Sequence, residues 1–366
     1  MTSLYEKYNL KPVINASGKM TILGVSKYVK EAIEAQQFGG EHFFEMENLE
    51  KNVGKYLAEL IEVEDAHIVS SASAGIAQSI AAVIGRGRSY HVEKPYSDRF
   101  KQREIVLPKG HNVNYGAPVG TMIELGGGQI IEAGYANGCS ADDIAETCTE
   151  NTAAILYIKS HHSVQKSMLT VTEAAQVATD KGVPLIVDAA AEEDLKLYIE
   201  QGADIVIYSG AKALEGPSSG IILGKKKYIE WIRLQSHGIG RAMKIGKENI
   251  LGLAAAIERY LENGLETGES MKQRLEPFIK KLNDLPHIKA NTIQDGAGRD
   301  IYRAEVLIEQ NNNYSAKEIV YELQNGSPAI YTRNYQLNNN IIEFDIRSVD
   351  TNEMNQIIDR LKSIVD

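Results

Sequence analysis

The sequence has few of the features that mark several large classes of protein. Its 366 residues include only two cysteines, Cys139 and Cys148, which excludes a disulfide framework and a cysteine-rich metal site. Acidic residues outnumber basic ones by 49 to 39, and the resulting net charge of −10 disfavours nucleic acid as a partner. No apolar run reaches the roughly 18 residues of a membrane-spanning helix, and the N-terminus lacks the pattern of a signal peptide. The sequence therefore predicts a cytoplasmic protein with no nucleic-acid and no membrane partner.

The chain does contain a regular alternation of strand-like and helical segments between about residues 47 and 225. Short β-branched runs such as "AAILYI", "PLIVDAA" and "DIVIYSG" alternate with helical stretches such as "VTEAAQVATDKG" and "EEDLKLYIEQG". This alternation predicts βαβ units in an α/β fold, with a mostly parallel central sheet that is buried on both faces.

The pattern changes near residue 262, which predicts a second domain. Beyond that point strands alternate with helices over a shorter stretch, as in a small α+β domain. We expect an N-terminal segment (1–35) that packs on the small domain, a large domain (36–261) and a small C-terminal domain (262–366).

Three of the expected strands end in residues suited to chemistry, at the edge where parallel sheets bind ligands. The first, "AHIVS", runs through a turn of small residues directly into a helix. A helix N-terminus with close backbone approach suits a phosphate, although such a turn could equally serve tight packing. The residues of this turn are Ser71, Ala72, Ser73, Ala74 and Gly75.

The second strand ends in Asp188, and the third is followed by Lys212. A buried carboxylate needs a cationic or hydrogen-bonded partner, or else Asp188 caps the next helix. Lys212 lies in a loop of Gly, Pro and Ser that leaves it room to act as a Schiff-base nucleophile; the alternative is a surface lysine. A phosphate cradle, an acid and a lysine in this order favour an enzyme that holds pyridoxal 5'-phosphate.

Other cofactor motifs are missing. The segments "LGGGQ" and "GRGRSY" do not match the dinucleotide fingerprint, and there is no P-loop. The eight histidines form no metal-binding pattern, so we expect no metal.

With these residues, the chain resembles the selenocysteine synthase (L-seryl-tRNA selenium transferase) superfamily of pyridoxal-phosphate enzymes. The resemblance covers about residues 12–260 and implies an aspartate-aminotransferase-like fold (fold type I). It implies that Lys212 is the Schiff-base lysine, that Asp188 partners the pyridine nitrogen, and that Ser209 and the 71–75 turn bind the cofactor phosphate. A histidine commonly stacks on the cofactor ring in this fold, and we assign His111 to that place. The matching segments are "VINASGKMTILG", "EAGYANGCSADDI", "NTAAILYIKSHHSVQ", "VPLIVDAAAEEDL", "YSGAKALEGPSSGIILGKK" and "GRAMKIGKENILGLAAAIERY".

Departures from the synthases disfavour a tRNA substrate. The resemblance begins almost at residue 1, without the tRNA-binding domain. Ala211 stands where the synthases have aspartate, and residues 160–162 (Ser-His-His) stand where they have Thr-Ser-Asn. The segments "SGAKALEGP" and "INASGKMT" instead resemble the D-glucosaminate-6-phosphate ammonia-lyase branch, which implies elimination of water and release of ammonia from a small phosphorylated amino acid. Another eliminase, a racemase, an aldolase and a catalytically silent relative are the alternatives.

The resemblance also implies sites for the two anionic groups of such a substrate. We expect an arginine of the small domain, Arg347 or its competitor Arg333, at the carboxylate. The remaining candidates lie in the large domain, where we expect them at the distal phosphate or elsewhere on the substrate. They are His42, His161, Arg241 and Lys244. Enzymes of this fold share sites between subunits, which predicts a homodimer or a larger even-numbered assembly.

Overall fold

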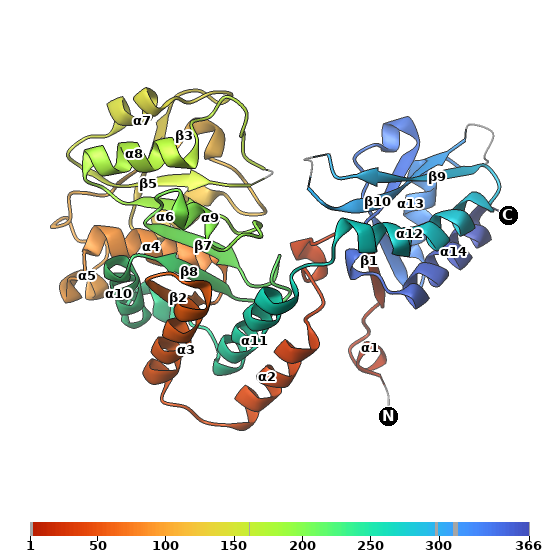
Figure 1. Cartoon of the computed structure of the whole chain (residues 1–366), viewed down its shortest axis with the longest axis horizontal. Helices are drawn as coiled ribbons and strands as arrows, with labels where there is room; N and C mark the ends of the chain where they lie inside the picture. Colours follow the sequence, from red (N-terminus) through yellow and green to blue (C-terminus); the bar gives the residue numbers. More distant parts are fainter. Residues whose placement is uncertain (1–2, 161, 297–298, 310–313, 366) are drawn as a thin grey trace. The chain divides into compact units, whose positions relative to one another are not determined.

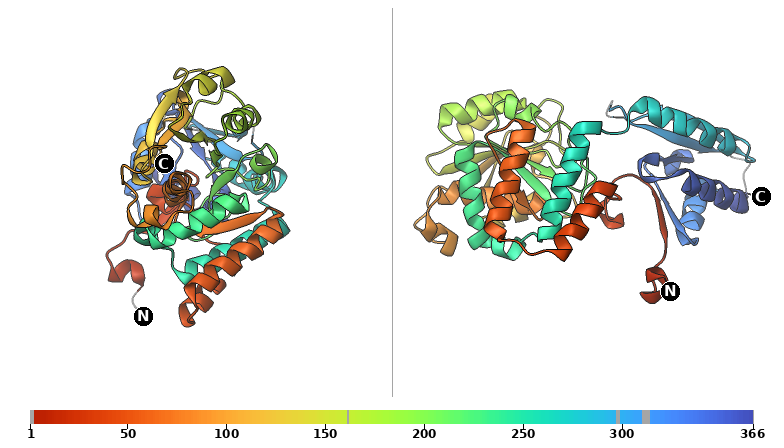
Figure 2. Two further views of the ribbon diagram at one scale, coloured as in Figure 1. Left: turned by 90° about the vertical axis from the view of Figure 1, so that its left-hand side faces the viewer. Right: turned by 60° about the horizontal axis from the view of Figure 1, so that its bottom comes forward.

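The computed structural model describes residues 3–160, 162–296, 299–309 and 314–365. The chain divides into a large unit, residues 28–263, and a small unit, which combines residues 1–27 with 264–366 (Figure 1). The first boundary lies before the expected 35/36, because α2 (Lys30–Glu41) packs lengthwise on α11 (Lys247–Asn263), as Figure 2 shows. The second boundary lies at 263/264, where 261/262 was expected.

Within the described residues, a seven-stranded sheet forms the centre of the large unit (Figure 1). Its order is β2-β8-β7-β6-β5-β3-β4. Strand β8 runs antiparallel to both of its neighbours, and the other strands pair in parallel, which confirms the mostly parallel sheet. The strands are β2 (Asp65–Val69), β3 (Glu104–Pro108), β4 (Gln129–Ala133), β5 (Thr152–Ile158), β6 (Leu185–Asp188), β7 (Ile205–Ser209) and β8 (Gly220–Gly224).

Helices cover both faces of this sheet, because neighbouring residues of each strand point to opposite sides. Val187 and Val206 belong to the core that includes residues of α3, α7, α8 and α11. Ile186 and Ile207 belong to the core on the other face, with residues of α4, α6 and α10. The alternation therefore directs Asp188 to the face of α4. The helices are α3 (Met46–Ile61), α4 (Ala72–Gly85), α5 (Ser89–Glu93), α6 (Val119–Leu125), α7 (Ala141–Thr147), α8 (Val171–Lys181), α9 (Leu197–Glu200) and α10 (Lys226–Leu234).

One helix is shorter than the sequence predicts. The segment "EEDLKLYIEQG" (192–202) was expected to be helical, but only α9, residues 197–200, is. The carboxylate of Asp194 accepts hydrogen bonds from the N–H groups of Lys196 (2.9 Å) and Leu197 (3.0 Å). Such a local turn competes with the helix, because it uses N–H groups in a different backbone arrangement.

The small unit is built from both ends of the chain. Strand β1 (Val13–Ala16) pairs in parallel with β11 (Ala329–Thr332), and a second, antiparallel sheet has the order β12-β10-β9. Apolar side chains from both sheets and three helices form one core, which includes Ile14, Phe278 and Phe344. The other elements are α1 (Leu4–Lys7), α12 (Gly268–Asn283), β9 (Ile288–Gln294), β10 (Tyr302–Ile308), α13 (Ala316–Asn325), β12 (Ile341–Phe344) and α14 (Thr351–Val365).

Transmembrane segments are not found in the part of the chain that the structure describes, since none of its helices is both long and apolar enough to span a bilayer.

Candidate active site

The N-terminus of α4 lies directly on the sheet. Ser71 caps the helix, and its Oγ atom accepts a hydrogen bond from the N–H of Ala74 at 3.0 Å. A Cβ atom on Gly75 would lie 3.0 Å from the side chain of Ile207, and one on Gly220 would lie 2.8 Å from the carbonyl carbon of Ser71. Both glycines thus allow the helix to approach the strands closely. The first turn holds no acidic residue, so those of its N–H groups that do not already donate to Ser71 can receive an anion.

Asp188 ends β6 as a buried acid, 6% exposed. Its Oδ1 atom accepts a hydrogen bond from the N–H of Ala190 at 3.1 Å. Burial raises the pKa of this carboxyl to about 6, although the nearby charge of Lys212 and the hydrogen bond oppose the shift. The next helix, α9, begins only at Leu197, so Asp188 does not cap a helix.

Lys212 lies in the turn after β7, close enough to Asp188 for the two charges to interact. Burial lowers the pKa of its amino group, and Asp188 partly offsets this effect. Backbone hydrogen bonds fix the surrounding loop. The N–H of Gly210 donates to the carbonyl oxygen of Ser219 (2.9 Å), and the N–H of Val29 donates to the carbonyl oxygen of Glu215 (3.1 Å). A lysine and an acid with pKa values shifted by burial are typical of a functional site.

These features fit pyridoxal phosphate in three respects. A buried carboxylate suits the pyridine nitrogen, an amino group with a lowered pKa suits the aldehyde, and the start of α4 suits the phosphate. Ser209, at the end of β7, lies on the same face of the sheet as Ile207 and therefore on the side of α4.

His111 is buried, and protein groups engage both of its ring nitrogens. Its Nε2 atom lies 3.0 Å from the carbonyl oxygen of Val164, and its Nδ1 atom accepts from the N–H of Ile158 at 3.3 Å. The ring meets that of Tyr157 edge-on, with centroids 4.5 Å apart. Burial lowers the pKa of His111 to about 4, so the imidazole is neutral at pH 7. Its stacking on a cofactor ring stays a prediction.

Two residues of this region were missed in the sequence. The hydroxyl of Tyr115 lies 3.3 Å from Oγ of Ser73, and its pKa is raised by burial and by the charge of Asp188. The backbone N–H of Lys159 donates to the carbonyl oxygen of Asp188 at 2.8 Å, beside the strand pair β5–β6. For Lys159 the available signal was its position directly after β5, whereas Tyr115 lies in an irregular loop beyond β3 and gave no such signal.

The candidates for the distal phosphate lie on the surface of the large unit. His42, Arg241 and Lys244 are exposed. The amino group of Lys247 donates to the carbonyl oxygens of Gly39 and Gly40, so the end of α2 meets the segment that carries Lys244. His161 lies outside the described residues.

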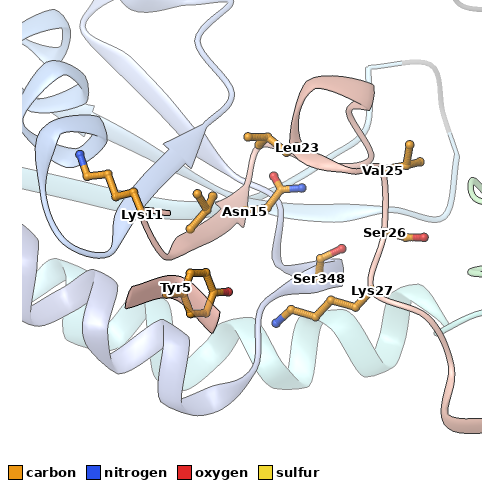
Figure 3. A pocket seen from close by; sticks show the side chains of 9 residues that line it. Tyr5, Lys11, Asn15, Leu23, Val25, Ser26, Lys27 and Ser348 are labelled. Atoms are coloured by element: carbon orange, nitrogen blue, oxygen red, sulfur yellow. The ribbon is translucent and has the colours of Figure 1, made fainter. Parts of the chain in front are cut away.

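Both arginines proposed for the carboxylate belong to the small unit and form ion pairs there. Arg347 pairs with Asp345 at 2.8 Å, and Arg333 pairs with Glu343 at 3.2 Å. Figure 3 shows a separate pocket of about 220 Å³ in this unit, lined by residues between Tyr5 and Lys27 and by Ser348. None of the predicted site residues lines it.

The sheet order gives this chain the fold type I architecture, which its solved structural neighbours share. A serine palmitoyltransferase from S. paucimobilis with a bound PLP–myriocin aldimine shares this fold, with a TM-score of 0.58 and 12% identity over 96% of this chain and 86% of that one. The chain belongs to the L-seryl-tRNA selenium transferase family, whose pattern matches residues 13–295.

Two relatives align with the whole chain. The D-glucosaminate-6-phosphate ammonia lyase of Salmonella typhimurium is 42% identical over 365 residues, which cover 100% of this chain and 98% of the relative. A solved structure of D-glucosaminate-6-phosphate ammonia-lyase superposes with a TM-score of 0.94, at the same identity and coverage. The 5'-C-glycyluridine monooxygenase-decarboxylase of a Streptomyces species is 34% identical over 368 residues, covering 100% of this chain and 92% of the relative.

Proposed function

We propose that this protein is a pyridoxal-phosphate-dependent ammonia-lyase that converts D-glucosaminate 6-phosphate into 2-keto-3-deoxy-6-phosphogluconate and ammonia. The observation that carries the proposal is the interaction of Asp188, which is buried on the α4 side of the sheet, with the half-buried Lys212. The likeness to an ammonia lyase over the full chain supports the choice of substrate.

Bound pyridoxal phosphate would supply an electron sink for the negative charge that develops at C2 of the substrate. Asp188 would keep the pyridine nitrogen protonated, and the first turn of α4, with Ser71, Ser73 and Ser209, would bind the phosphate. Lys212 would hold the cofactor and then take the C2 proton, which its lowered pKa favours at neutral pH. His111 is proposed to pack on the cofactor ring.

The chemistry balances with no further reagent. The C2–H bond breaks and its proton goes to Lys212, and the C3 hydroxyl leaves with a proton as water. The elimination leaves a double bond between C2 and C3, and C3 then takes a proton. A water molecule replaces the nitrogen at C2, and since one water is lost and one is added, the net change is the loss of one ammonia. We assign the carboxylate to Arg347, with Arg333 as the competitor, and the distal phosphate to Arg241, Lys244 and His42. His161 stays a candidate contact of the substrate.

A second candidate is oxidative decarboxylation of an amino acid on the same cofactor, with molecular oxygen as the oxidant. The 34% identity to a monooxygenase-decarboxylase over the whole chain favours it. The two reactions give different products, since only decarboxylation releases carbon dioxide.

We further propose that the protein works in the cytoplasm as a homodimer or a larger even-numbered assembly. Cys139 and Cys148 are both free thiols, as is usual in a reducing compartment.

The test is to incubate the purified protein with D-glucosaminate 6-phosphate and to measure ammonia and 2-keto acid. D-Glucosaminate without the phosphate and D-serine are the controls. We expect keto acid from the phosphorylated compound and much less from the others. Equal rates with and without the phosphate would remove the proposed role of Arg241 and Lys244, and no keto acid from any of them would exclude the lyase.

Borohydride reduction tests the cofactor separately. The protein should be yellow, and reduction should attach the cofactor to Lys212. A Lys212→Ala variant should lose both the label and turnover. Lys159→Ala removes a lysine at the same edge of the sheet and should still be labelled. A colourless wild-type protein that pyridoxal phosphate cannot reconstitute would contradict the assignment.

A further inference from the structure

A tyrosine hydroxyl of the large unit reaches the first turn of α4 from outside the helix. Tyr115 lies in the loop between β3 and α6, and its Oη atom is 3.3 Å from the Oγ atom of Ser73, the second residue of α4. The side chain of Tyr115 is half-buried and packs against the core on the α4 face of the sheet. Two hydroxyl groups from separate segments therefore lie side by side at the start of α4.

Backbone hydrogen bonds close the loop that carries Tyr115. The N–H of Tyr115 donates to the carbonyl oxygen of Ala117 at 3.2 Å, and the N–H of Val119 donates to the carbonyl oxygen of Val113 at 3.0 Å. Val119 is also the first residue of α6, which packs on α4. Because the loop is held in place without a ligand, less conformational freedom is lost when Tyr115 binds one.

The first turn of α4 has two N–H groups left for a ligand. Those of Ala74 and Gly75 already donate to Ser71, each at 3.0 Å. Those of Ala72 and Ser73 have no acceptor within the part of the chain that the structure describes. A phosphate monoester presents three strongly accepting oxygens, more than two N–H groups can satisfy. Hydroxyl groups at this turn would therefore take part in binding it.

The charge state of Tyr115 suits an anion. Burial raises the pKa of its hydroxyl above the ordinary value of 10, the hydrogen bond with Ser73 opposes this shift, and the charge of Asp188 adds to it. The phenol is therefore neutral throughout the physiological range and can donate a hydrogen bond, whereas a phenolate would repel a phosphate. The effect of Asp188 also indicates that Tyr115 belongs to the same site as this acid.

We propose that the hydroxyl of Tyr115 binds the phosphate of pyridoxal phosphate together with Ser73 at the start of α4. The inference rests on the proposed function, which assigns the phosphate to this turn and the pyridine nitrogen to Asp188. The two hydroxyl groups supply donors that the helix N-terminus alone lacks, and hydrogen bonds to a charged acceptor are the stronger ones. Tyr115 thus contributes to the affinity for the cofactor.

Tyr228, in α10, provides a matched control in the same core. It is also half-buried and packs against the same apolar cluster. Burial raises the pKa of its hydroxyl, and the charge of Asp204 adds to this shift as that of Asp188 does for Tyr115. The charge of Arg86, the residue after α4, acts on Tyr228 as well, so this tyrosine lies toward the far end of the helix.

Two ligands that differ only in the phosphate separate its binding from that of the ring. Pyridoxal phosphate and pyridoxal are each titrated into cofactor-free protein, and the dissociation constants are measured by absorbance. We expect wild type to bind pyridoxal phosphate more tightly. Tyr115→Phe keeps the ring and loses only the hydroxyl, so it should weaken pyridoxal phosphate binding about tenfold and leave pyridoxal binding within about twofold. Tyr228→Phe should leave both constants within about twofold of wild type.

A second comparison tests whether Tyr115 acts directly or only by holding Ser73. In a Ser73→Ala background, Tyr115→Phe should still weaken pyridoxal phosphate binding severalfold, because the phenol itself contacts the phosphate. No further loss in that background overturns the proposal, and so does an unchanged preference in Tyr115→Phe or an equal loss in Tyr228→Phe. A wild type that binds both ligands equally removes the phosphate site as well, whereas ammonia release from D-glucosaminate 6-phosphate tests the lyase independently.

Discussion

Asp188 and Asp204 are buried aspartates of one sheet whose surroundings differ. Asp204 directly precedes β7. It accepts a hydrogen bond from the N–H of Leu185, at the start of β6, at 2.8 Å, and it forms an ion pair with Lys225, directly after β8, at 2.7 Å. Asp188 stands at the opposite end of β6, near Lys212. Asp204 therefore joins parts of the sheet, whereas Asp188 is the acid that we propose for the cofactor.

Asp188→Asn should retain the cofactor and lose most turnover. A neutral amide cannot keep the pyridine nitrogen protonated, so the rate should fall on the order of 10²-fold or more. The measurement is kcat together with the absorbance of bound cofactor. Asp204→Asn is the control and should lower the free energy of unfolding but not kcat per folded protein. Near-normal kcat in Asp188→Asn would show that the acid does not serve the cofactor.

The raised pKa of Asp188 also predicts a pH effect on the cofactor-free protein. With a pKa of about 6, against 3.8 for an ordinary aspartate, the folded state binds this proton more tightly than the unfolded state does. The stabilising effect is present below pH 4 and is lost as the pH rises to about 6. Wild type should therefore lose on the order of 3 kcal/mol relative to Asp188→Asn across this window. Urea unfolding of both proteins at several pH values measures this difference. The same dependence of the free energy of unfolding on pH in both proteins would contradict the prediction.

At the scale of elements, the strands of the large unit were predictable because each contains a short run of apolar residues, many of them β-branched. The positions of Asp188 and Lys212 were predictable too, since Asp188 ends β6 and Lys212 lies in the turn after β7. The contact of Tyr115 with Ser73 was not, because it joins an irregular loop to the start of α4. The pairing of Arg303 with Asp345 was also beyond local patterns, since it joins residues of distant segments.

Gly220→Ala should weaken cofactor binding by displacing the start of α4. The new Cβ atom would lie 2.8 Å from the carbonyl carbon of Ser71 and 2.9 Å from the nitrogen of Ala72, and backbone cannot yield as a side chain can. The N–H groups that we propose to bind the phosphate would shift. Because a small displacement of binding groups is costly, we expect the affinity for pyridoxal phosphate to fall tenfold or more. Spectrophotometric titration with pyridoxal phosphate measures the affinity.

Gly224→Ala is the control at the other end of β8. Its Cβ atom would lie 2.2 Å from the carbonyl oxygen of Asp204, so this variant should be destabilised as well. It should nevertheless bind the cofactor normally when folded, because the clash is far along the strand from α4. Equal losses of affinity in both variants would indicate a general effect of strain.

At the scale of the whole molecule, the surface of α2 and the segment after it predicts self-association. Ile33 is 53% exposed, Phe38 52% and Phe43 99%. Apolar side chains gathered in this way usually mark an interface. Sedimentation should show an even-numbered assembly, and Phe43→Ser should shift it toward smaller species. Tyr335→Ser, which changes a residue 78% exposed in the small unit, should have no such effect. A wild-type monomer with full activity would contradict shared sites.

The parallel pairing of β1 with β11 has a consequence for synthesis on the ribosome. Residues 13–16 leave the ribosome long before their partner strand, which begins at Ala329. At about 5–20 residues per second, β1 waits on the order of 15–60 s for that strand. The large unit, which is encoded without interruption by residues 28–263, can fold during this delay. During this delay the nascent chain carries an unpaired strand, which makes β1 a natural place for a chaperone to bind.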